Sequence, residues 1–110
     1  MFAIKEGERK INGKIIDTFS RDITEPLTGM TVEAGTTGFM GSPHRGAGGR
    51  TYVSFVVNHG DFHFEPVRND NGQMAGFEIA CCGDGGLNAI LRALAFAYEA
   101  INDQANDVED

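Results

Sequence analysis

Thr51-Tyr-Val-Ser-Phe-Val-Val57 decides the first part of the fold, and Leu87-Asn-Ala-Ile-Leu-Arg-Ala-Leu-Ala-Phe-Ala-Tyr98 decides the rest. The first stretch is β-branched and aromatic on both sets of alternating positions, which is typical of a strand with most of both faces covered. The second repeats apolar residues every three or four positions, which predicts an amphipathic helix. The change from one pattern to the other predicts an α+β fold.

Turn signals extend this pattern in both directions along the chain. Asn58-His-Gly-Asp61 precedes Phe62-His-Phe-Glu-Pro-Val67, and we expect it to join that segment to 51–57 as a hairpin. Asn69-Asp-Asn-Gly72 predicts a second hairpin to 74–80, because Asn-Gly favours tight turns. Pro66 predicts a strand end or a sheet edge. With extended segments at 14–19 and 29–34, the first three-quarters of the chain reads as an antiparallel β-meander.

The predicted helix runs from about 86 to 101 and packs on this sheet. Asp84 is its expected N-cap, and Asn102 or Asp103 its expected end, followed from about 102 by a frayed acidic tail. Alanines within it supply helix propensity. Its sheet-facing stripe is predicted to be Leu87, Ile90, Leu91, Leu94, Tyr98 and Ile101.

Length and composition indicate one soluble domain over residues 1–110. With 41% hydrophobic and 23% charged residues, the chain of 110 can bury one core. A net charge of -7 argues against a DNA or RNA duplex as partner, because phosphate backbones need a broad cationic face. No apolar stretch approaches the roughly 20 residues of a membrane span, and no signal region is evident, so we expect a cytoplasmic protein. The adjacent Cys81 and Cys82 fit neither a disulfide framework nor a Cys-x-x-Cys site.

The segment from Gly35 to Arg50 is the main candidate site. It holds six glycines, two arginines and a histidine, and can present backbone amides and guanidinium groups to a small anion. The alternative is a flexible connection between two strands. Gly83-Asp-Gly-Gly86 is similarly either an anion site at a helix start or a capped turn. The candidate loop residues are Gly41, Arg45, Gly48, Gly49 and Arg50.

Conventional catalytic sites find little support. The glycine-rich segment lacks the order of a phosphate-binding P-loop and leads into a strand instead of a helix. His44, His59 and His63 occupy a loop, a turn and a strand, which does not indicate a metal site. No nucleophile has a partnered base, and no two acids are paired. We therefore expect no enzyme activity, no metal and no cofactor.

Three segments, 32–41, 48–52 and 77–88, resemble the first-described anti-Thoeris proteins of phages, which sequester cyclic ADP-ribose isomers made by bacterial TIR-domain defence enzymes. The resemblance covers roughly residues 30 to 95. It implies an antiparallel β region with C-terminal helices, a homodimer or higher homo-oligomer, and binding without cleavage. Some members also hold cyclic oligonucleotides at separate sites. Residues 40–49 depart from the family's more compact loop, which leaves the identity of the bound signal open.

By position, the resemblance implies ligand contacts at Arg50, Phe77 and Asn88. Phe77 would stack on adenine, Arg50 and Arg45 would pair with a diphosphate, and Asn88 would read a base or ribose edge. The alternatives are a core role for Phe77, a solvated Arg45, a loop-tying Arg50 and an Asn88 that only starts the helix. A chain this short has little room for a deep cleft, so dimerisation would help by building the pocket from two chains.

The predicted function is therefore sequestration of a cyclic nucleotide immune signal in the host cytoplasm during infection. A phage structural or assembly protein without a ligand is one alternative. A nucleotide or phosphate-ester hydrolase is the other.

Overall fold

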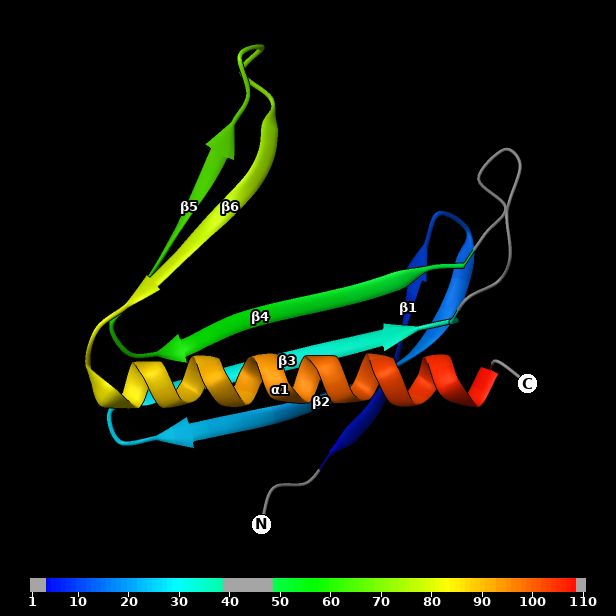
Figure 1. Cartoon of the computed structure of the whole chain (residues 1–110), viewed down its shortest axis with the longest axis horizontal. Coiled ribbons are helices and arrows are strands. Elements are labelled where there is room, and N and C mark those ends of the chain that lie inside the picture. The colour runs from blue at the N-terminus through cyan, green and yellow to red at the C-terminus, as the bar shows by residue number, and fades with distance from the viewer. Residues whose placement is uncertain (1–3, 39–48, 109–110) are drawn as a thin grey trace.

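In the computed structural model, which describes residues 4–38 and 49–108, six strands precede one long helix (Figure 1). The α+β class expected from the sequence is confirmed, with an antiparallel meander followed by a helix that packs on it. The elements are β1 (Lys5–Ile11), β2 (Lys14–Glu25), β3 (Thr28–Thr36), β4 (Thr51–His59), β5 (Phe62–Arg68), β6 (Met74–Cys81) and α1 (Gly83–Val108).

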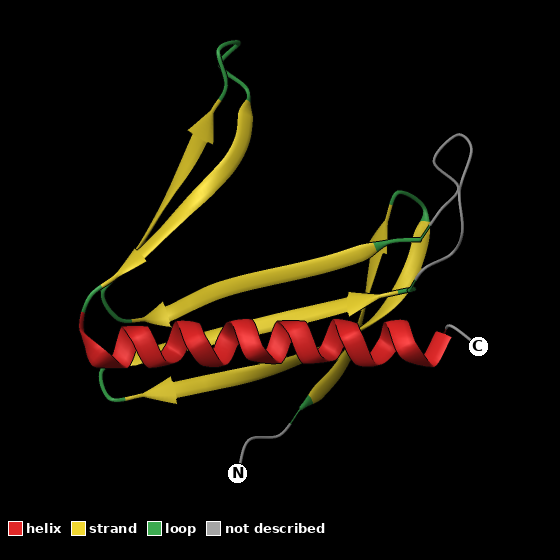
Figure 2. Ribbon diagram, in the orientation of Figure 1, coloured by secondary structure: helices red, strands yellow, loops and turns green. Residues whose placement is uncertain are grey.

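Four of the strands form one antiparallel sheet in the order β1-β2-β3-β4. The long β2 pairs with β1 through its first half and with β3 through its second half. Helix α1 lies across one face of this sheet, mainly over β3 and β2, and contacts β4 much less (Figure 2). The helix therefore covers only part of the face on which it packs.

The remaining two strands, β5 and β6, form a separate hairpin that rises away from the sheet (Figure 1). Its turn was predicted correctly: the Asn69 side-chain oxygen accepts hydrogen bonds from the backbone amides of Asn71 (2.9 Å) and Gln73 (3.1 Å). Pro66 lies within β5, opposite Phe77. Since this sheet has two strands, β5 is an edge strand, as its proline indicated.

The predicted hairpin between 51–57 and 62–67 is wrong. Within the described strands, β4 pairs with β3 and β5 pairs with β6, so the chain leaves the sheet at the turn instead of folding back along it. Gly60, with a φ of 125°, provides the change of direction. Turn-forming residues mark where a strand ends, but they do not select the strand's hydrogen-bonding partner.

The helix packs on the sheet through a different face from the predicted one. Its buried hydrophobic side chains are alanines and one phenylalanine, whereas four of the six predicted contacts are exposed. Small side chains let the helix axis approach the sheet closely, which leucines at the same positions would prevent. The core is formed by Ile23, Met30, Val32 and Ala34 from the sheet and by Ala89, Ala93, Phe96 and Ala97 from α1, with Ile101 packed against it.

Both predicted ends of the helix are also wrong. α1 begins at Gly83, which places Asp84 inside the first turn, and it continues to Val108 instead of ending near Asn102. The last turns are held by tertiary contacts: Ala105 is buried, and the Gln104 side chain bonds to backbone groups of β2 and β3. These contacts outweigh the weak helix propensity of the acidic residues there.

Candidate functional site

The base of the glycine-rich loop, between the end of β3 and the start of β4, is held together by hydrogen bonds. Backbone and side chain of Thr37 both bond to Arg50: the Thr37 amide donates to the Arg50 carbonyl, and the Arg50 amide donates to the Thr37 hydroxyl, each at 2.9 Å. The hydroxyls of Thr36 and Thr51 lie 2.8 Å apart. The Gly38 amide donates to the Thr36 hydroxyl, and Gly38 has a φ of 86° that favours glycine.

The C-terminal part of α1 is hydrogen-bonded to residues beside this loop base. The Gln104 amide oxygen accepts a hydrogen bond from the Thr36 backbone amide at 3.1 Å, and its amide nitrogen donates to the Asp17 carbonyl at 3.0 Å. One glutamine therefore connects helix, β2 and β3 beside the loop.

Arg50 is half-buried, and its guanidinium bonds to backbone carbonyl oxygens of the β1–β2 turn. Its Nε donates to Ile11 at 2.9 Å and its Nη2 to Asn12 at 3.2 Å, while Nη1 donates to Gly49 at 3.2 Å. These contacts fit the alternative interpretation, in which Arg50 holds the base of the loop in place. These three carbonyl oxygens help to orient the guanidinium.

The other candidate residues of this loop fall partly outside the described residues. Gly41, Arg45 and Gly48 lie within 39–48 and are not placed. Gly49 is exposed next to Arg50. Of these candidates, Arg50 is therefore the residue whose side-chain contacts are described.

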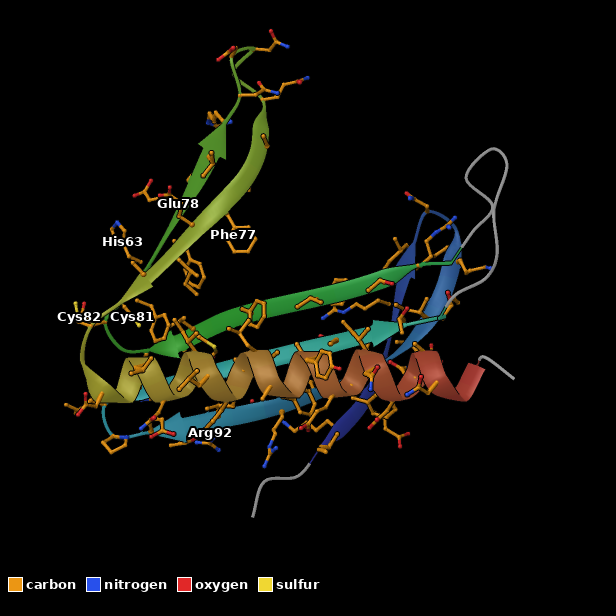
Figure 3. All side chains as sticks on the ribbon, in the orientation of Figure 1. His63, Phe77, Glu78, Cys81, Cys82 and Arg92 are labelled. Carbon is orange, nitrogen blue, oxygen red and sulfur yellow. The ribbon has the colours of Figure 1, made fainter. Side chains whose placement is uncertain are left out.

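A second candidate region lies where the hairpin leans over β4. Figure 3 shows Phe77 on the side of the hairpin that faces β4, and Glu78 and His63 on the other side. Phe77 is 57% exposed, so the predicted core alternative does not hold for this residue. It lines a cavity of about 390 Å³ together with Val53 and Phe55 of β4, Phe64, Glu65 and Pro66 of β5, and Met74 of β6.

A smaller cavity of about 140 Å³ continues beneath the first, between the hairpin and α1. It shares Phe55 and Phe77 with the larger one and is otherwise lined by Met30, Ile79, Ile90, Ala93 and Leu94. Every side chain around it is apolar, so this space suits a ring or an aliphatic group and not a phosphate.

Among the predicted site residues that the structure describes, Arg50, Phe77 and Asn88 do not lie together within one chain. Arg50 precedes β4 at the loop end of the molecule, Phe77 lies above the middle of β4, and Asn88 belongs to the opposite end of α1 (Figures 1 and 3). Asn88 is exposed and is not among the described residues that line either cavity.

The glycines at the helix start have a packing role. A Cβ on Gly85 would lie 2.8 Å from the Pro26 carbonyl oxygen, so only glycine lets the first turn of α1 approach the β2–β3 turn this closely. This contact gives Gly85 a packing role that involves no anion.

A polar network on the sheet face opposite α1 was missed by the sequence reasoning. Arg9 of β1 reaches across β2 to Glu33 of β3, with Nε–Oε2 at 3.0 Å and Nη2–Oε1 at 2.6 Å. The Thr18 hydroxyl donates to Glu33 at 2.7 Å, and Arg9 stacks 5.1 Å from the centre of the Tyr52 ring. The Arg9 hydrogen bond, aided by Thr18, holds the pKa of Glu33 below its ordinary value, although partial burial opposes this shift.

No pattern in the sequence marks this network, because its members come from four different strands and meet only when the sheet forms. Arg9 and Glu33 are in strands that are not neighbours, and Thr18 fills the gap between them. It links the strands, and we assign it a structural role.

The described histidines do not converge. His63 pairs with Glu65 at 3.2 Å on the exposed hairpin, and His59 lies beside Gly29, while His44 is outside the described residues. Within residues 4–38 and 49–108, no group of three or more His, Cys, Asp or Glu gathers at one point. In the same residues, no helix combines the length and apolar content needed to cross a membrane.

Comparison with known proteins gives no relative from which to carry over a function. No family model matches the chain, and searches of curated proteins and of solved structures likewise find no match.

Proposed function

We propose that the protein binds and sequesters a small anionic nucleotide of the cyclic ADP-ribose type without cleaving it, and so inhibits a Thoeris-type antiviral defence. The proposal rests mainly on the way Arg50 is held. A half-buried guanidinium, oriented by backbone carbonyls at the base of a glycine-rich loop, has the planar geometry suited to pairing with a diphosphate. Holding it in place beforehand reduces the entropy lost when a ligand binds.

The aromatic cavity supplies the second kind of contact that such a ligand needs. Phe77, Phe64 and Phe55 surround a space of about 390 Å³, which lies within the range of small-molecule pockets. An adenine ring would stack on Phe77 there.

A pocket shared between two copies of the chain would unite these contacts. In one chain the Arg50 end and the Phe77 cavity stand apart along β4, so a single nucleotide would meet Arg50 of one copy and Phe77 of the other. Asn88 and the loop residues Arg45, Gly41 and Gly48 remain proposed contacts by resemblance alone, and Gly49 would contribute its backbone.

A structural or assembly role without a ligand is the second candidate function. It is favoured by the large exposed apolar side chains of α1 and the hairpin, which a small nucleotide would not cover. This role predicts assembly of the chain with no nucleotide uptake.

The two functions separate when the purified protein is incubated with cyclic ADP-ribose isomers and then freed of unbound ligand. Chromatography of the ligand released by heating should return unmodified nucleotide in stoichiometric amount, with or without chelator. Binding should weaken as salt is raised, because the main contact is electrostatic. A linear product that accumulates with time would instead indicate a hydrolase, and no uptake would favour the structural role.

Replacement of Arg50 tests the residue on which the proposal depends. Arg50→Ala should weaken binding by about 1.5–3 kcal/mol, the range for hydrogen bonds to a charged group. Because this variant also loses the bonds to Ile11 and Asn12, its unfolding is measured in parallel, and Arg50→Lys retains the charge without the planar fork. Arg68→Ala, at an exposed arginine bonded to Gly72 on the hairpin tip, is the matched control. Unchanged affinity in a folded Arg50→Ala protein would remove Arg50 from the site.

A further inference from the structure

The β5–β6 hairpin is attached to the rest of the molecule at its base and stands free beyond it. Phe62 and Ile79, near the base, pack against the core. Farther out, Phe64, Met74 and Phe77 are 42%, 61% and 57% exposed. Beyond the base, β5 and β6 contact mainly each other, and a two-stranded hairpin alone in water is only marginally stable.

The dimensions of the chain agree with this open arrangement. Its radius of gyration is 15.8 Å, whereas a compact chain of this length has about 13 Å. The excess fits a hairpin that rises away from β4 (Figure 1). Both connections at the base of the hairpin contain a glycine with positive φ, Gly60 at 125° and Gly83 at 83°. Glycines at these two points can absorb a change of chain direction.

β4 has a free edge on the side toward which the hairpin rises (Figure 1). Among the described strands it pairs with β3 alone, and the Arg50 amide and carbonyl just before it are both directed to Thr37, the residue after β3. Because peptide groups alternate in direction along a strand, Val53, Phe55 and Val57 direct theirs away from β3. β4 contains no Lys, Arg, Asp or Glu, whereas the other edge strand, β1, has five in seven residues. Charge therefore protects the β1 edge and leaves the β4 edge open to pairing.

The connection from β4 to β5 has the length of a tight hairpin loop. Only Gly60 and Asp61 stand between the two strands. Two-residue hairpin loops favour a positive-φ glycine at the first of these positions. Pairing continued from this loop sets Val57 opposite Phe64 and Phe55 opposite Pro66, and it uses the peptide groups that β4 leaves free.

In that register both faces of the extended sheet match. Phe55 lies on the α1 side of β4, since it pairs with the core residue Val32. Phe64 and Pro66 join it on that side, where they add to the apolar face, and Glu65 lies on the opposite, polar face. A shift of one residue would reverse every side chain, so the chain's own apolar pattern specifies this one pairing.

Pro66 weakens the same pairing at one point. Opposite Phe55 it has no N–H to donate to the Phe55 carbonyl, so closure past this residue loses one hydrogen bond of the ladder. Matching faces thus favour the pairing of β5 with β4, while the proline opposes its completion.

We propose that the β5–β6 hairpin is a hinged flap, which moves between the position in the structure and a closed position in which β5 pairs with β4. Closing extends the four-stranded sheet to the order β1-β2-β3-β4-β5-β6. It also brings Phe64 and Phe77 against Val53 and Phe55, which removes the cavity of about 390 Å³ between them. A ligand that stacks on Phe77 binds only to the open position, so the flap controls access to the cavity. The flap itself does not rest on the proposed nucleotide binding, and only its effect on uptake does.

Disulfide trapping of the full chain without nucleotide tests the closed position. In a background of Cys81→Ala and Cys82→Ala, the changes Val56→Cys and Glu65→Cys place two thiols directly opposite each other when the flap is closed, within the span of a disulfide. Oxidised glutathione should then produce an intramolecular disulfide, seen as a band that migrates faster than the reduced single chain. Val56 and Glu65 are both exposed, so the variant should retain the wild-type far-ultraviolet circular dichroism.

Val56→Cys with Glu78→Cys is the matched control. Glu78 lies opposite Glu65 on β6, which places it two strands from β4, about 9–10 Å away in the closed position and too far for a disulfide. The Val56/Glu65 pair should cross-link at least about tenfold faster than this control. Ser54→Cys with Val67→Cys is a second pair in the same register, and it takes the place of the first pair if that variant does not fold.

Pro66→Val tests the register itself, because it supplies the N–H that closure lacks. Added to the Val56/Glu65 pair, it should raise the cross-linking rate about two- to tenfold, the range for one net hydrogen bond. Equal rates for the Val56/Glu65 pair and its control, or no response to Pro66→Val, would overturn the flap.

Nucleotide uptake separates the flap from the proposed function. The cross-linked chain should take up no cyclic ADP-ribose, and reduction of the disulfide should restore uptake. Uptake by the cross-linked chain at undiminished affinity would overturn the control of access. If the reduced chain takes up none either, the sequestering function is rejected, and the cross-linking rates still decide whether the flap closes.

Discussion

On α1, the face that touches the sheet is lined mostly by alanine, and the face that points away carries leucine and tyrosine. Ala89 and Ala93 are almost completely buried, whereas Leu91 and Leu94 are more than half exposed. The smaller residues are buried because they let the helix approach β2 and β3 closely, and packing density depends on that approach. Residue size along a helix therefore does not show which face meets its own sheet.

The largest expected effect comes from Phe96, a large buried side chain on the inner face of α1. Phe96→Ala should lower the free energy of unfolding by about 3–5 kcal/mol, because it empties part of the core. Tyr98→Ala removes a ring of similar size from the exposed face of α1 and should change the free energy of unfolding by no more than about 0.5 kcal/mol. Urea denaturation at low protein concentration measures both. Similar losses in the two variants would show that α1 is not oriented as described.

Enlarging an alanine probes the same difference from the opposite direction. Ala93→Leu should cost about 1–3 kcal/mol, since it forces a larger side chain between helix and sheet. Ala95 is exposed on α1, and Ala95→Leu is therefore the control, with little expected change. The shift in the midpoint of thermal unfolding is measured for both variants. If Ala93→Leu were tolerated as well as Ala95→Leu, close approach would not explain the alanine face.

Lowering the pH should distinguish the contribution of the apolar contact of α1 from that of the polar network on the opposite face of the sheet. The pKa of Glu33 lies below its ordinary value of 4.5, chiefly through its hydrogen bond with Arg9. The stabilisation is therefore fully present above pH 4.5 and is lost as pH falls through the lowered folded-state pKa. Arg9→Gln should reduce stability at pH 7 by less than either inner-face variant, and its difference from wild type should shrink below pH 4.5.

The control for this experiment is Ala93→Leu, whose cost involves no titrating group and should stay nearly constant with pH. Unfolding free energies at pH 7 and at several values below 4.5 give the comparison. A difference between wild type and Arg9→Gln that did not change with pH would contradict the assigned role of the Glu33 carboxylate.

The smallest effect is expected for Leu94, on the exposed face of α1. Leu94→Ala should change the stability of dilute protein by no more than about 0.5 kcal/mol, whereas a core leucine would cost about 2–5 kcal/mol. Urea denaturation measures the change. A loss of about 2 kcal/mol or more would place Leu94 in the core.

Local chemistry was sufficient to predict several elements of the fold. The Asn69–Gly72 turn, the edge position of Pro66 and the succession from strands to helix follow from backbone preferences of a few neighbouring residues. The pairing of β4 was not predictable in this way. Whether β4 pairs with β3 or with β5 depends on long-range packing. The local sequence of the 58–61 turn does not distinguish between these two pairings.

The candidate site was predictable only as a set of residue types. Glycines around Arg50 indicated an anion-binding loop, but the Arg50 bonds to Ile11 and Asn12 join positions that are distant in sequence. The aromatic cavity around Phe77 likewise forms because the hairpin leans over β4, an arrangement that no local pattern encodes.

Backbone preferences and apolar periodicity along the chain specify where its strands and its helix occur, because these depend on residues within a few positions of one another. Which face of α1 is buried depends instead on how near the helix comes to the sheet, and both faces are apolar enough to be covered. Only three-dimensional packing resolved this choice, placing Ala89, Ala93 and Phe96 against β2 and β3 and leaving Leu87, Leu91, Leu94 and Tyr98 exposed.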